Sequence, residues 1–405
     1  MTDDETLARL RALDGPQGRA LLEALRGVDV TGEGRLALGT RLRRDHPAEL
    51  VAAALGQQEL RARAAAKFPR AADMLFTRAG LEQASSAVVA RHRAARYRGC
   101  ARIADLCCGI GGDLVALADG PAVVEGGVLA VDRDPVHLEL ARHNAAVHGV
   151  AGRVAFREAD VRAVDLAGVD AAFVDPARRT GTGRRLGDGE PPLRWCVGDL
   201  AARVGRVGIK AAPGLPHEAV PPGWEAEFVA VDRDLKEAVL WSPALATPGP
   251  AGVPAPTRAT VLPAGDTLVA GVGDDPVAVG DPAEYLLDPN PAVTRAGLVE
   301  ELARRLGGHK IDDRIAFLAS ADPVRTPFAR TLRVVDSGPW HQKQLAQRLR
   351  RLDVGAVDIR RRGLAGDVDA LHRGLRLTGS RRATLVMTRV RDRPWALVCV
   401  DAEAG

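Results

Sequence analysis

A glycine-rich turn follows an apolar run in the segment RIADLCCGIGGDLVALA, residues 102–118. Gly109, Gly111 and Gly112 permit backbone angles that other residues avoid, and they let a ligand approach the main chain closely. A dinucleotide-binding loop requires G-x-G-x-x-G, in which the third glycine packs the following helix against the strand. Leu114 occupies that third position. The sequence therefore argues against a nicotinamide-dependent dehydrogenase.

Aspartates stand at the ends of four successive predicted strands, at Asp105, Asp132, Asp160 and Asp175. One aspartate in such a place is usually a turn former or a helix cap. Four of them fall along the carboxyl edge of a parallel sheet, where ligands bind. A carboxylate at Asp105 repels phosphate but suits the ammonium and sulfonium groups of S-adenosylmethionine, with roughly 4 kcal/mol per charge pair at about 4 Å and an effective dielectric near 20. Asp132 is placed to accept both ribose hydroxyls, and Asp160 an adenine amine.

These side chains need a parallel sheet to position them. Residues 98–246 alternate short apolar runs with helical stretches, which predicts an α/β fold with a Rossmann-like sheet. Residues 1–97 carry apolar residues at three- and four-residue spacings and predict a helical N-terminal region. Residues 247–290 are rich in Pro and Gly and are either a linker or a small β segment. Residues 291–405 follow an α+β pattern that begins with one helix over 291–307.

Composition narrows the class of protein. The 405 residues contain no run of 18 apolar residues and open with no signal peptide, so we expect a soluble, cytoplasmic protein without membrane contact. The five cysteines form no CxxC pair, which predicts neither disulfides nor a metal site. Residues 291–405 hold 22 Lys and Arg against 13 Asp and Glu, an excess of nine in a chain whose net charge is +4. This basic third favours a polyanionic partner, or it is a solvated arginine-rich surface.

Residues 101–180 resemble a class I S-adenosylmethionine-dependent methyltransferase through DLCCGIGG and VLAVDRDPVHLELARHNAAVHGV. They are particularly similar to the RNA cap guanine methyltransferases of the trimethylguanosine synthase group. The whole chain also resembles a bacterial family with a helical N-terminal region, this catalytic domain and a THUMP-like C-terminal domain, through KFPRAADMLFTRAGLEQASSAVVARHRA, FVDPARR and LHRGLRLTGSRRATLVMTRV. The resemblance implies S-adenosylmethionine as cofactor. The expected cofactor-binding residues are Asp105, Cys107, Gly109, Gly111, Gly112, Asp132, Arg133 and Asp160.

The segment after the fourth strand departs from that family's pattern. Enzymes that methylate an exocyclic amine carry Asp, Asn or Ser there, followed by two prolines and an aromatic residue, and the first side chain accepts hydrogens from the amine. This chain keeps Asp175 and Pro176 but has Ala177 and Arg178 in the other two places. We expect Asp175, Pro176 and Arg178 to be catalytic, mainly by alignment of the reactants, which can contribute roughly 7–11 kcal/mol.

Several residues are candidates for binding the acceptor. The guanidinium of Arg178 or the indole of Trp195 could stack on a base, or Arg178 and Arg179 could hold a phosphate. Lys210, near the end of a fifth predicted strand, is either a contact of a substrate phosphate or an exposed lysine. The alternative is that Asp175 caps a turn and the arginines face solvent.

The resemblance to THUMP-type domains implies RNA binding by backbone and shape, and the arginines in RLRRLDVGAVDIRRRG and GSRRATLVMTRVRDR fit phosphate contacts. The leading hypothesis is therefore methylation of a base of tRNA or rRNA. The alternatives are a methyltransferase of a small molecule or protein, and a non-catalytic RNA-binding protein that keeps the fold. The segment LEQASS, residues 81–86, is either a lid over the cofactor or a simple helix N-terminus.

Overall fold

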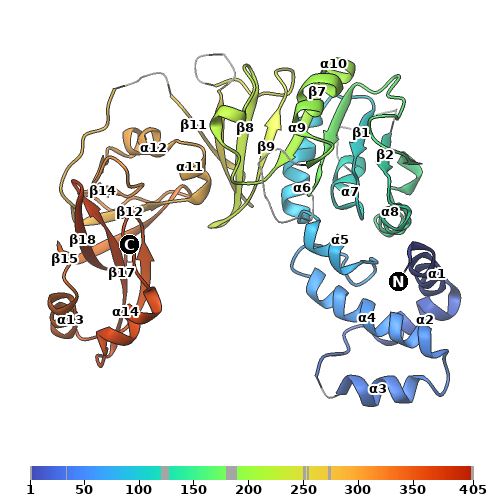
Figure 1. Cartoon of the computed structure of the whole chain (residues 1–405), viewed down its shortest axis with the longest axis horizontal. Helices are drawn as coiled ribbons and strands as arrows, with labels where there is room; N and C mark the ends of the chain where they lie inside the picture. Colours follow the sequence, from blue (N-terminus) through green and yellow to red (C-terminus); the bar gives the residue numbers. More distant parts are fainter. Residues whose placement is uncertain are drawn as a thin grey trace. The chain divides into compact units, whose positions relative to one another are not determined.

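The computed structural model describes residues 2–32, 34–119, 127–178, 189–249, 252, 255–271 and 275–402. The chain divides into two compact units, traced in Figure 1. The first unit comprises Met1–Glu225 and Val239–Ala246, and the second comprises Ala226–Ala238 and Thr247–Gly405. The division of the sequence into the regions 1–97, 98–246, 247–290 and 291–405 stays a prediction.

The N-terminal region is helical, as its spacing of apolar residues predicts. Its helices are α1 (Asp3–Asp14), α2 (Pro16–Ala24), α3 (Gly34–Leu42), α4 (Ala48–Ala64), α5 (Arg78–Gln83), α6 (Ala87–Ala94) and the short η1 (Ala95–Tyr97). Thr2 and Glu5 form a capping box that starts α1, and Thr77 caps α5. Such caps satisfy N–H groups that the first helical turn leaves unpaired.

A parallel sheet follows, which confirms the predicted Rossmann-like fold. Its strands run in the order β7-β4-β1-β2-β3. The strands are β1 (Ile103–Leu106), β2 (Val128–Asp132), β3 (Val154–Glu158), β4 (Ala171–Val174) and β7 (Arg206–Ala211). The connecting helices include α7 (Gly112–Asp119), α8 (Pro135–Val147), α9 (Leu193–Trp195) and α10 (Ala201–Val204), with a π-helical turn η3 (Cys196–Leu200) between the last two. Strands β1, β2 and β4 are buried throughout, as expected of parallel strands covered on both faces.

The N-terminal helices pack against the glycine turn that follows β1. Their apolar core includes Ile110 of that turn together with Val136 and Leu140 of α8. The amide of Asn144 in α8 binds both the N–H and the carbonyl of Leu75, and it also donates to the carbonyl of Ile110. The N-terminal helices therefore share an apolar core with the glycine turn and α8.

The chain enters the second unit in β8 (Glu225–Val231), one residue after that strand begins. It returns to the first unit within β9 (Asp234–Trp241), at Val239. Strand β10 (Thr257–Leu262) pairs parallel with β8 and antiparallel with β11 (Asp266–Val269), so part of the Pro/Gly-rich stretch is a small β segment. The prediction of a single helix over 291–307 is wrong. The segment forms two helices, α11 (Pro291–Arg295) and α12 (Val299–Leu306), because Gly297 takes a left-handed φ of 72° between them.

A seven-stranded sheet forms the rest of the second unit, in the order β13-β14-β12-β15-β18-β17-β16. The strands are β12 (Tyr285–Pro289), β13 (His309–Lys310), β14 (Leu318–Ser320), β15 (Ala329–Pro339), β16 (Val354–Arg361), β17 (Arg381–Val390) and β18 (Arg393–Asp401). Leu385 and Met387 of β17 join one apolar core with helices α13 (Gln342–Arg351) and α14 (Val368–Leu375), whereas Val386 joins a second core with Phe317. The alternation is that of a strand covered on both faces. Strands β17 and β18 pair antiparallel and form a hairpin.

All five cysteines are free. Across the parts of the chain that the structure describes, no helix has the length and apolar character needed to span a membrane.

We predict that Gly80→Ala destabilises the first unit. A Cβ at this position in α5 would lie 2.4 Å from Cγ2 of Ile110, so the helix and the glycine turn would have to separate. Overpacking of this kind costs about 1–3 kcal/mol. The midpoint of thermal unfolding, followed by scanning calorimetry, should fall.

The matched control is Gly56→Ala in α4, where nothing lies within 4 Å of the added Cβ. That variant should gain about 0.4–1 kcal/mol because alanine restricts the unfolded chain. Equal effects of the two substitutions would contradict the proposed packing of α5 on Ile110.

Candidate active site

The carboxylate of Asp105 lies near the carboxyl end of β1 and is 1% exposed. Its Oδ2 atom has no hydrogen-bond partner among the residues that the structure describes. Burial raises the pKa of Asp105 well above its usual range, and the negative charges of Asp113 and Asp175 raise it further. A buried acceptor without a partner costs about 1–3 kcal/mol. This oxygen therefore fits a cationic or N–H-bearing group of a ligand.

The turn after β1 has an unusual backbone. Cys107, Gly109 and Gly111 all take left-handed conformations, with φ of 61°, 53° and 86°. A Cβ on Gly111 would lie 3.3 Å from Cα of Ala141 in α8, whereas one on Gly109 would meet nothing within 4 Å. Gly111 is thus required by a close approach to α8, and Gly109 leaves its surroundings open. Burial raises the pKa of the Cys107 thiol well above its usual range, which favours its neutral form over the reactive thiolate.

Asp132 ends β2 and fastens the glycine turn. Its Oδ2 accepts the N–H of Gly109 at 2.8 Å, and its Oδ1 accepts the N–H of Asp134 at 3.0 Å. Burial opposes ionisation, but hydrogen bonding to His137 and to these two amides outweighs it, so the pKa of Asp132 lies below its usual value. The carboxylate is 7% exposed and is held in its charged form beside the turn. That state fits the predicted role as an acceptor of ribose hydroxyls.

Asp160 lies two residues after β3 and is already paired. Arg162 donates to it at 2.6 Å and also contacts Glu190 at 3.0 Å. The hydrogen bond from Arg162 lowers the pKa of Asp160 to about 2, and the charge of the exposed Arg133 adds a smaller decrease. The predicted contact with an adenine amine therefore has to share this carboxylate with Arg162. It remains a prediction.

Asp175 directly follows β4 and forms an ion pair with Lys210 of β7. Its Oδ2 lies 2.6 Å from the Nζ of Lys210, and both side chains are largely buried. Lys210 is therefore paired rather than simply exposed, and its expected contact with a substrate phosphate remains a prediction. The negative charge of Asp175 also acts on Asp105, so the two carboxylates share one edge of the sheet. The ion pair orients Asp175 and leaves Oδ1 for another donor.

The residues after Asp175 form a short ribbon. Strand β5 (Ala177–Arg178) pairs antiparallel with β6 (Gly189–Glu190), and Pro176 lies so close to Gly189 that a Cβ there would be 2.9 Å away. Glu190 reaches both Arg162 and the sulfur of Cys107, at 3.0 Å and 4.0 Å. The ribbon therefore links the segment after Asp175 with Arg162, the partner of Asp160.

Three predicted residues on the acceptor side have less definite places. Trp195 is half-buried in α9. Arg178 has a described backbone in β5, and its side chain lies outside what the structure describes. Arg179 lies outside the described residues. Their roles remain predictions.

Sequence reasoning missed a buried ion pair behind the site. Arg93 of α6 is 1% exposed, pairs with Asp113 at the start of α7 and stacks on Phe173 of β4 at 4.9 Å. Its charge opposes the rise in the pKa of Asp105. Nothing in the spacing of an arginine on a helix 20 residues upstream signals this contact.

The segment predicted as a lid or a helix start contains a second unpaired polar atom. The hydroxyl of Ser85 has no hydrogen-bond partner among the described residues, and this residue is 9% exposed. Its carbonyl lies 3.5 Å from the place of a Cβ on Gly112, beside the glycine turn. Lys67 fixes the segment by donating to the carbonyls of Leu81 and Ala84 at 2.7 and 3.0 Å. Ser86 stands at the N-cap of α6.

These features fit S-adenosylmethionine. Asp105 would offer a buried acceptor to its positive end, Ser85 a donor to its carboxylate, and Asp132 an ionised acceptor to its ribose. Within the described ranges, no group of three or more His, Cys, Asp and Glu could hold a metal ion.

We predict opposite effects of Asp105→Asn on stability and on cofactor affinity. The folded chain binds the Asp105 proton more tightly than the unfolded chain does, so its stability is full below the ordinary carboxyl pKa and falls as pH rises toward the raised pKa. The ligand-free variant should therefore unfold at a higher temperature than the wild type at neutral pH. Its affinity for S-adenosylmethionine should fall roughly 10- to 150-fold, since a charge-assisted hydrogen bond contributes about 1.5–3 kcal/mol.

Scanning calorimetry and isothermal titration calorimetry measure the two effects. Asp165→Asn, which changes an exposed carboxylate between β3 and β4, is the control and should leave both quantities unchanged. Wild-type affinity in Asp105→Asn would remove this carboxylate from the cofactor site.

Comparisons with known proteins agree with this geometry. A family model described as RNA cap guanine-N2 methyltransferase matches residues 100–180, and one described as THUMP domain-like matches residues 329–400. A domain of unknown function matches residues 4–64. The chain also shares its whole fold with a candidate methyltransferase from Porphyromonas gingivalis W83, with a TM-score of 0.72, 21% identity and coverage of 100% of both chains.

A protein of Mycobacterium tuberculosis, present in strains CDC 1551 and H37Rv, is 39% identical to this chain over 327 residues. The match covers 78% of this chain and 85% of the relative, which is described as an uncharacterized S-adenosylmethionine-dependent methyltransferase. The chain therefore belongs to the family of S-adenosylmethionine-dependent methyltransferases, with S-adenosylmethionine as its cofactor.

Proposed function

We propose that this methyltransferase modifies a base of tRNA or rRNA, at an exocyclic amine, and that its C-terminal unit helps to bind the RNA. The observation that carries the proposal is the ion pair between Asp175 and Lys210, at the same strand edge as Asp105. It puts an oriented carboxylate beside the predicted cofactor site. The match of residues 100–180 to RNA cap guanine-N2 methyltransferases supports RNA as the acceptor.

The residues of this chain would act mainly by alignment. S-adenosylmethionine supplies an electrophilic methyl group, so the acceptor needs little acid–base assistance. Lys210 holds Oδ2 of Asp175, and Oδ1 can accept an N–H of the amine. That hydrogen bond fixes the direction of the nitrogen lone pair. Asp175 can also take the proton that the amine loses after it gains the methyl group.

Ala177 in place of the second proline, and Arg178 in place of the aromatic residue, change how a base would be held. A guanidinium can stack on a base or bind a phosphate, whereas an aromatic ring can only stack. The half-buried Trp195 remains the predicted aromatic contact. The acceptor base is therefore held by a different set of side chains than in the RNA cap enzymes that the segment resembles.

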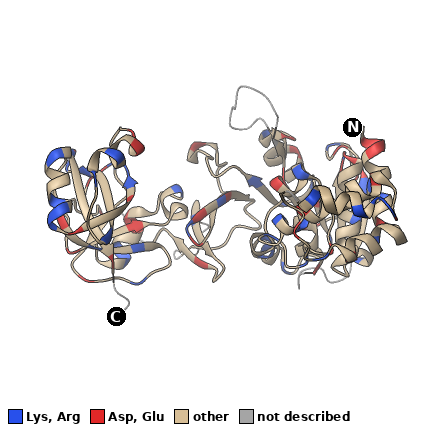
Figure 2. Cartoon of the chain, turned by 90° about the horizontal axis from the view of Figure 1, so that it is seen from below, with Lys and Arg blue, Asp and Glu red and all other residues tan. Residues whose placement is uncertain are grey.

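The C-terminal unit has the charge expected for a polyanionic partner. Residues 291–405 have nine more basic than acidic side chains, and Figure 2 shows Lys and Arg on the helices and strands of this part of the chain. The THUMP domain-like match over residues 329–400 supports RNA rather than another polyanion. Phosphate contacts of this kind make binding strongly salt-dependent.

We predict that Asp175→Asn and Lys210→Gln each slow methyl transfer to RNA. The first removes the charged acceptor and the second removes its orienting partner, and loss of a charge-assisted hydrogen bond corresponds to a decrease of roughly 10- to 150-fold in the rate. The measurement is transfer of tritium from labelled S-adenosylmethionine into total RNA from a strain that lacks the gene. Nuclease digestion of the labelled RNA then identifies the nucleotide.

Two control variants change the same residue types at exposed places. Asp165→Asn alters an exposed loop carboxylate, and Lys236→Gln breaks an exposed pair with Asp234. Both should transfer label at the wild-type rate, and all four variants should bind S-adenosylmethionine. Label in proteins or small molecules but not in RNA would overturn the proposal.

A further inference from the structure

A cavity of about 640 Å³ lies within the second unit, and the methyltransferase site does not use it. Its lining includes three arginines, Arg314, Arg362 and Arg389, and one carboxylate, that of Asp392. The volume lies in the range of about 300–1,000 Å³ that is typical of small-molecule sites. Most such sites are apolar, so three guanidinium groups around one cavity indicate an anionic ligand.

The fold brings these side chains together at the tip of the β17–β18 hairpin. Arg391 and Asp392 form its two-residue turn, and both have left-handed backbones, with φ of 46° and 65°. Such a turn favours Asn and Gly, so an arginine and an aspartate there carry backbone strain. The turn is held by the N–H of Arg391, which donates to Ile311 at 3.0 Å, and by that of Asp392, which donates to Asp312 at 2.6 Å. These contacts place Arg389 next to Arg314.

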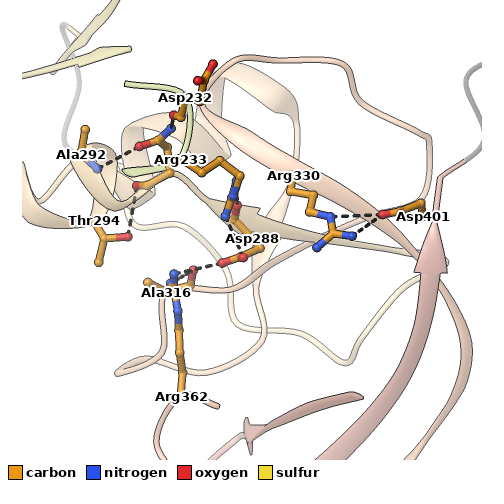
Figure 3. A network of polar contacts seen from close by, with 10 residues as sticks. Asp232, Arg233, Asp288, Ala292, Thr294, Ala316, Arg330, Arg362 and Asp401 are labelled. Atoms are coloured by element: carbon orange, nitrogen blue, oxygen red, sulfur yellow. Dashed lines mark hydrogen bonds and ion pairs between the residues drawn. The ribbon is translucent and has the colours of Figure 1, made fainter. Parts of the chain in front are cut away.

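Arg362 is a fixed wall of the cavity. Its guanidinium donates to the carbonyl of Ala316 at 3.0 Å, pairs with Asp288 at 2.9 Å and stacks on Phe317 at 4.8 Å. Figure 3 shows Arg362 and Arg233 meeting the same Asp288 carboxylate from two sides. One carboxylate therefore serves two guanidinium groups, and Asp288 balances only one of these two positive charges.

The other two arginines have unused donors. The Nε of Arg389 is buried and has no hydrogen-bond partner among the described residues, although its Nη2 binds the side chain of Asp392 at 2.7 Å. The exposed guanidinium of Arg314 forms no ion pair within the described chain. A buried charged donor without a partner costs more than a neutral one. An oxyanion beside the guanidinium groups of Arg314 and Arg389 would offset their positive charge.

The carboxylates nearby are engaged in structural contacts. Asp312 is 2% exposed and accepts the N–H groups of Arg314 and Asp392. Asp288 is taken by Arg233 and Arg362. Two guanidinium groups offset the charge of Asp288, whereas the contacts of Asp312 are two backbone N–H groups.

We propose that this cavity is a phosphate-binding pocket, and that the phosphate it takes is a phosphodiester of an RNA strand. The guanidinium fork matches two phosphate oxygens, which a lysine cannot do. A cavity of this volume also has room for the adjoining sugar. The assignment of the phosphate to RNA rests on the proposed function, whereas the binding of a phosphate rests on the pocket alone.

The test measures binding of a fluorescein-labelled, single-stranded 20-nucleotide RNA of mixed sequence to the full chain across a salt series. Arg314→Gln and Arg389→Gln should each weaken binding about tenfold at low salt. Each should also reduce the slope of log affinity against log salt by about 0.7, the value for one lost phosphate contact on a single strand.

Arg350→Gln is the matched control because it removes the same charge from the exposed surface of α13 in the same unit. It should change the affinity less than twofold. An equal loss of RNA affinity in Arg350→Gln would mean that RNA binds a diffuse basic surface, and it would overturn the proposed pocket. Arg314 is exposed, so its variant should keep the wild-type unfolding temperature even if Arg389→Gln disturbs the hairpin.

Titration with inorganic phosphate, followed by calorimetry, distinguishes the sources of the anion. Both variants could lose phosphate binding and keep the wild-type affinity for RNA. That result would assign the pocket to a free anion and overturn the assignment to RNA. Unchanged binding of both phosphate and RNA in both variants would overturn the proposal as a whole.

The pocket and the proposed methyl transfer can fail separately. None of the pocket residues belongs to the methyltransferase unit, so the variants should bind S-adenosylmethionine as the wild type does. RNA that binds through Arg314 but receives no label would count against the proposed function alone. Labelling of RNA with an unchanged KM in Arg314→Gln would count against the pocket alone.

Discussion

The unpaired, buried carboxylate of Asp105 is the constraint on which the first unit depends. A carboxyl group in this place opposes folding when it is charged, because no described residue satisfies its Oδ2. The negative charges of Asp113, Asp175 and Asp132 increase that cost, and the positive charge of Arg93 reduces it. A cationic ligand beside this oxygen would offset that cost, and the site would then be preorganised at the expense of stability.

The N-terminal helices supply much of that support. Asn144 uses its whole amide to join Leu75 to Ile110, and Gly80 lets α5 approach the same turn. Lys67 ties down the segment that contains Ser85 by donating to its carbonyls. The helical region therefore packs directly on the glycine turn and holds it through a shared apolar core and these hydrogen bonds.

The sequence predicts features that depend on a local pattern. The strands, the glycine turn and the acids at the strand ends follow from short apolar runs that stop at Asp or Gly, and the Rossmann-like fold is confirmed. Contacts between distant segments have no such pattern. Lys210 meets Asp175 across 35 residues, and Arg93 meets Asp113 across 20. Gly297 is the reverse case, because here the sequence did carry a local signal. The spacing of apolar residues led to the prediction of one helix, although the glycine separates two.

The two units use charge in opposite ways. Acids gather where the first unit would hold a cationic cofactor, and arginines with unused donors gather around a cavity of the second unit. The tryptophans of the second unit offer little for reading bases, since Trp395 donates to Ser337 at 2.8 Å and Trp340 packs against the core below α13. Recognition through this unit would then rest on phosphates and shape, which carry no sequence information. The choice of nucleotide would fall to the few side chains around Asp175.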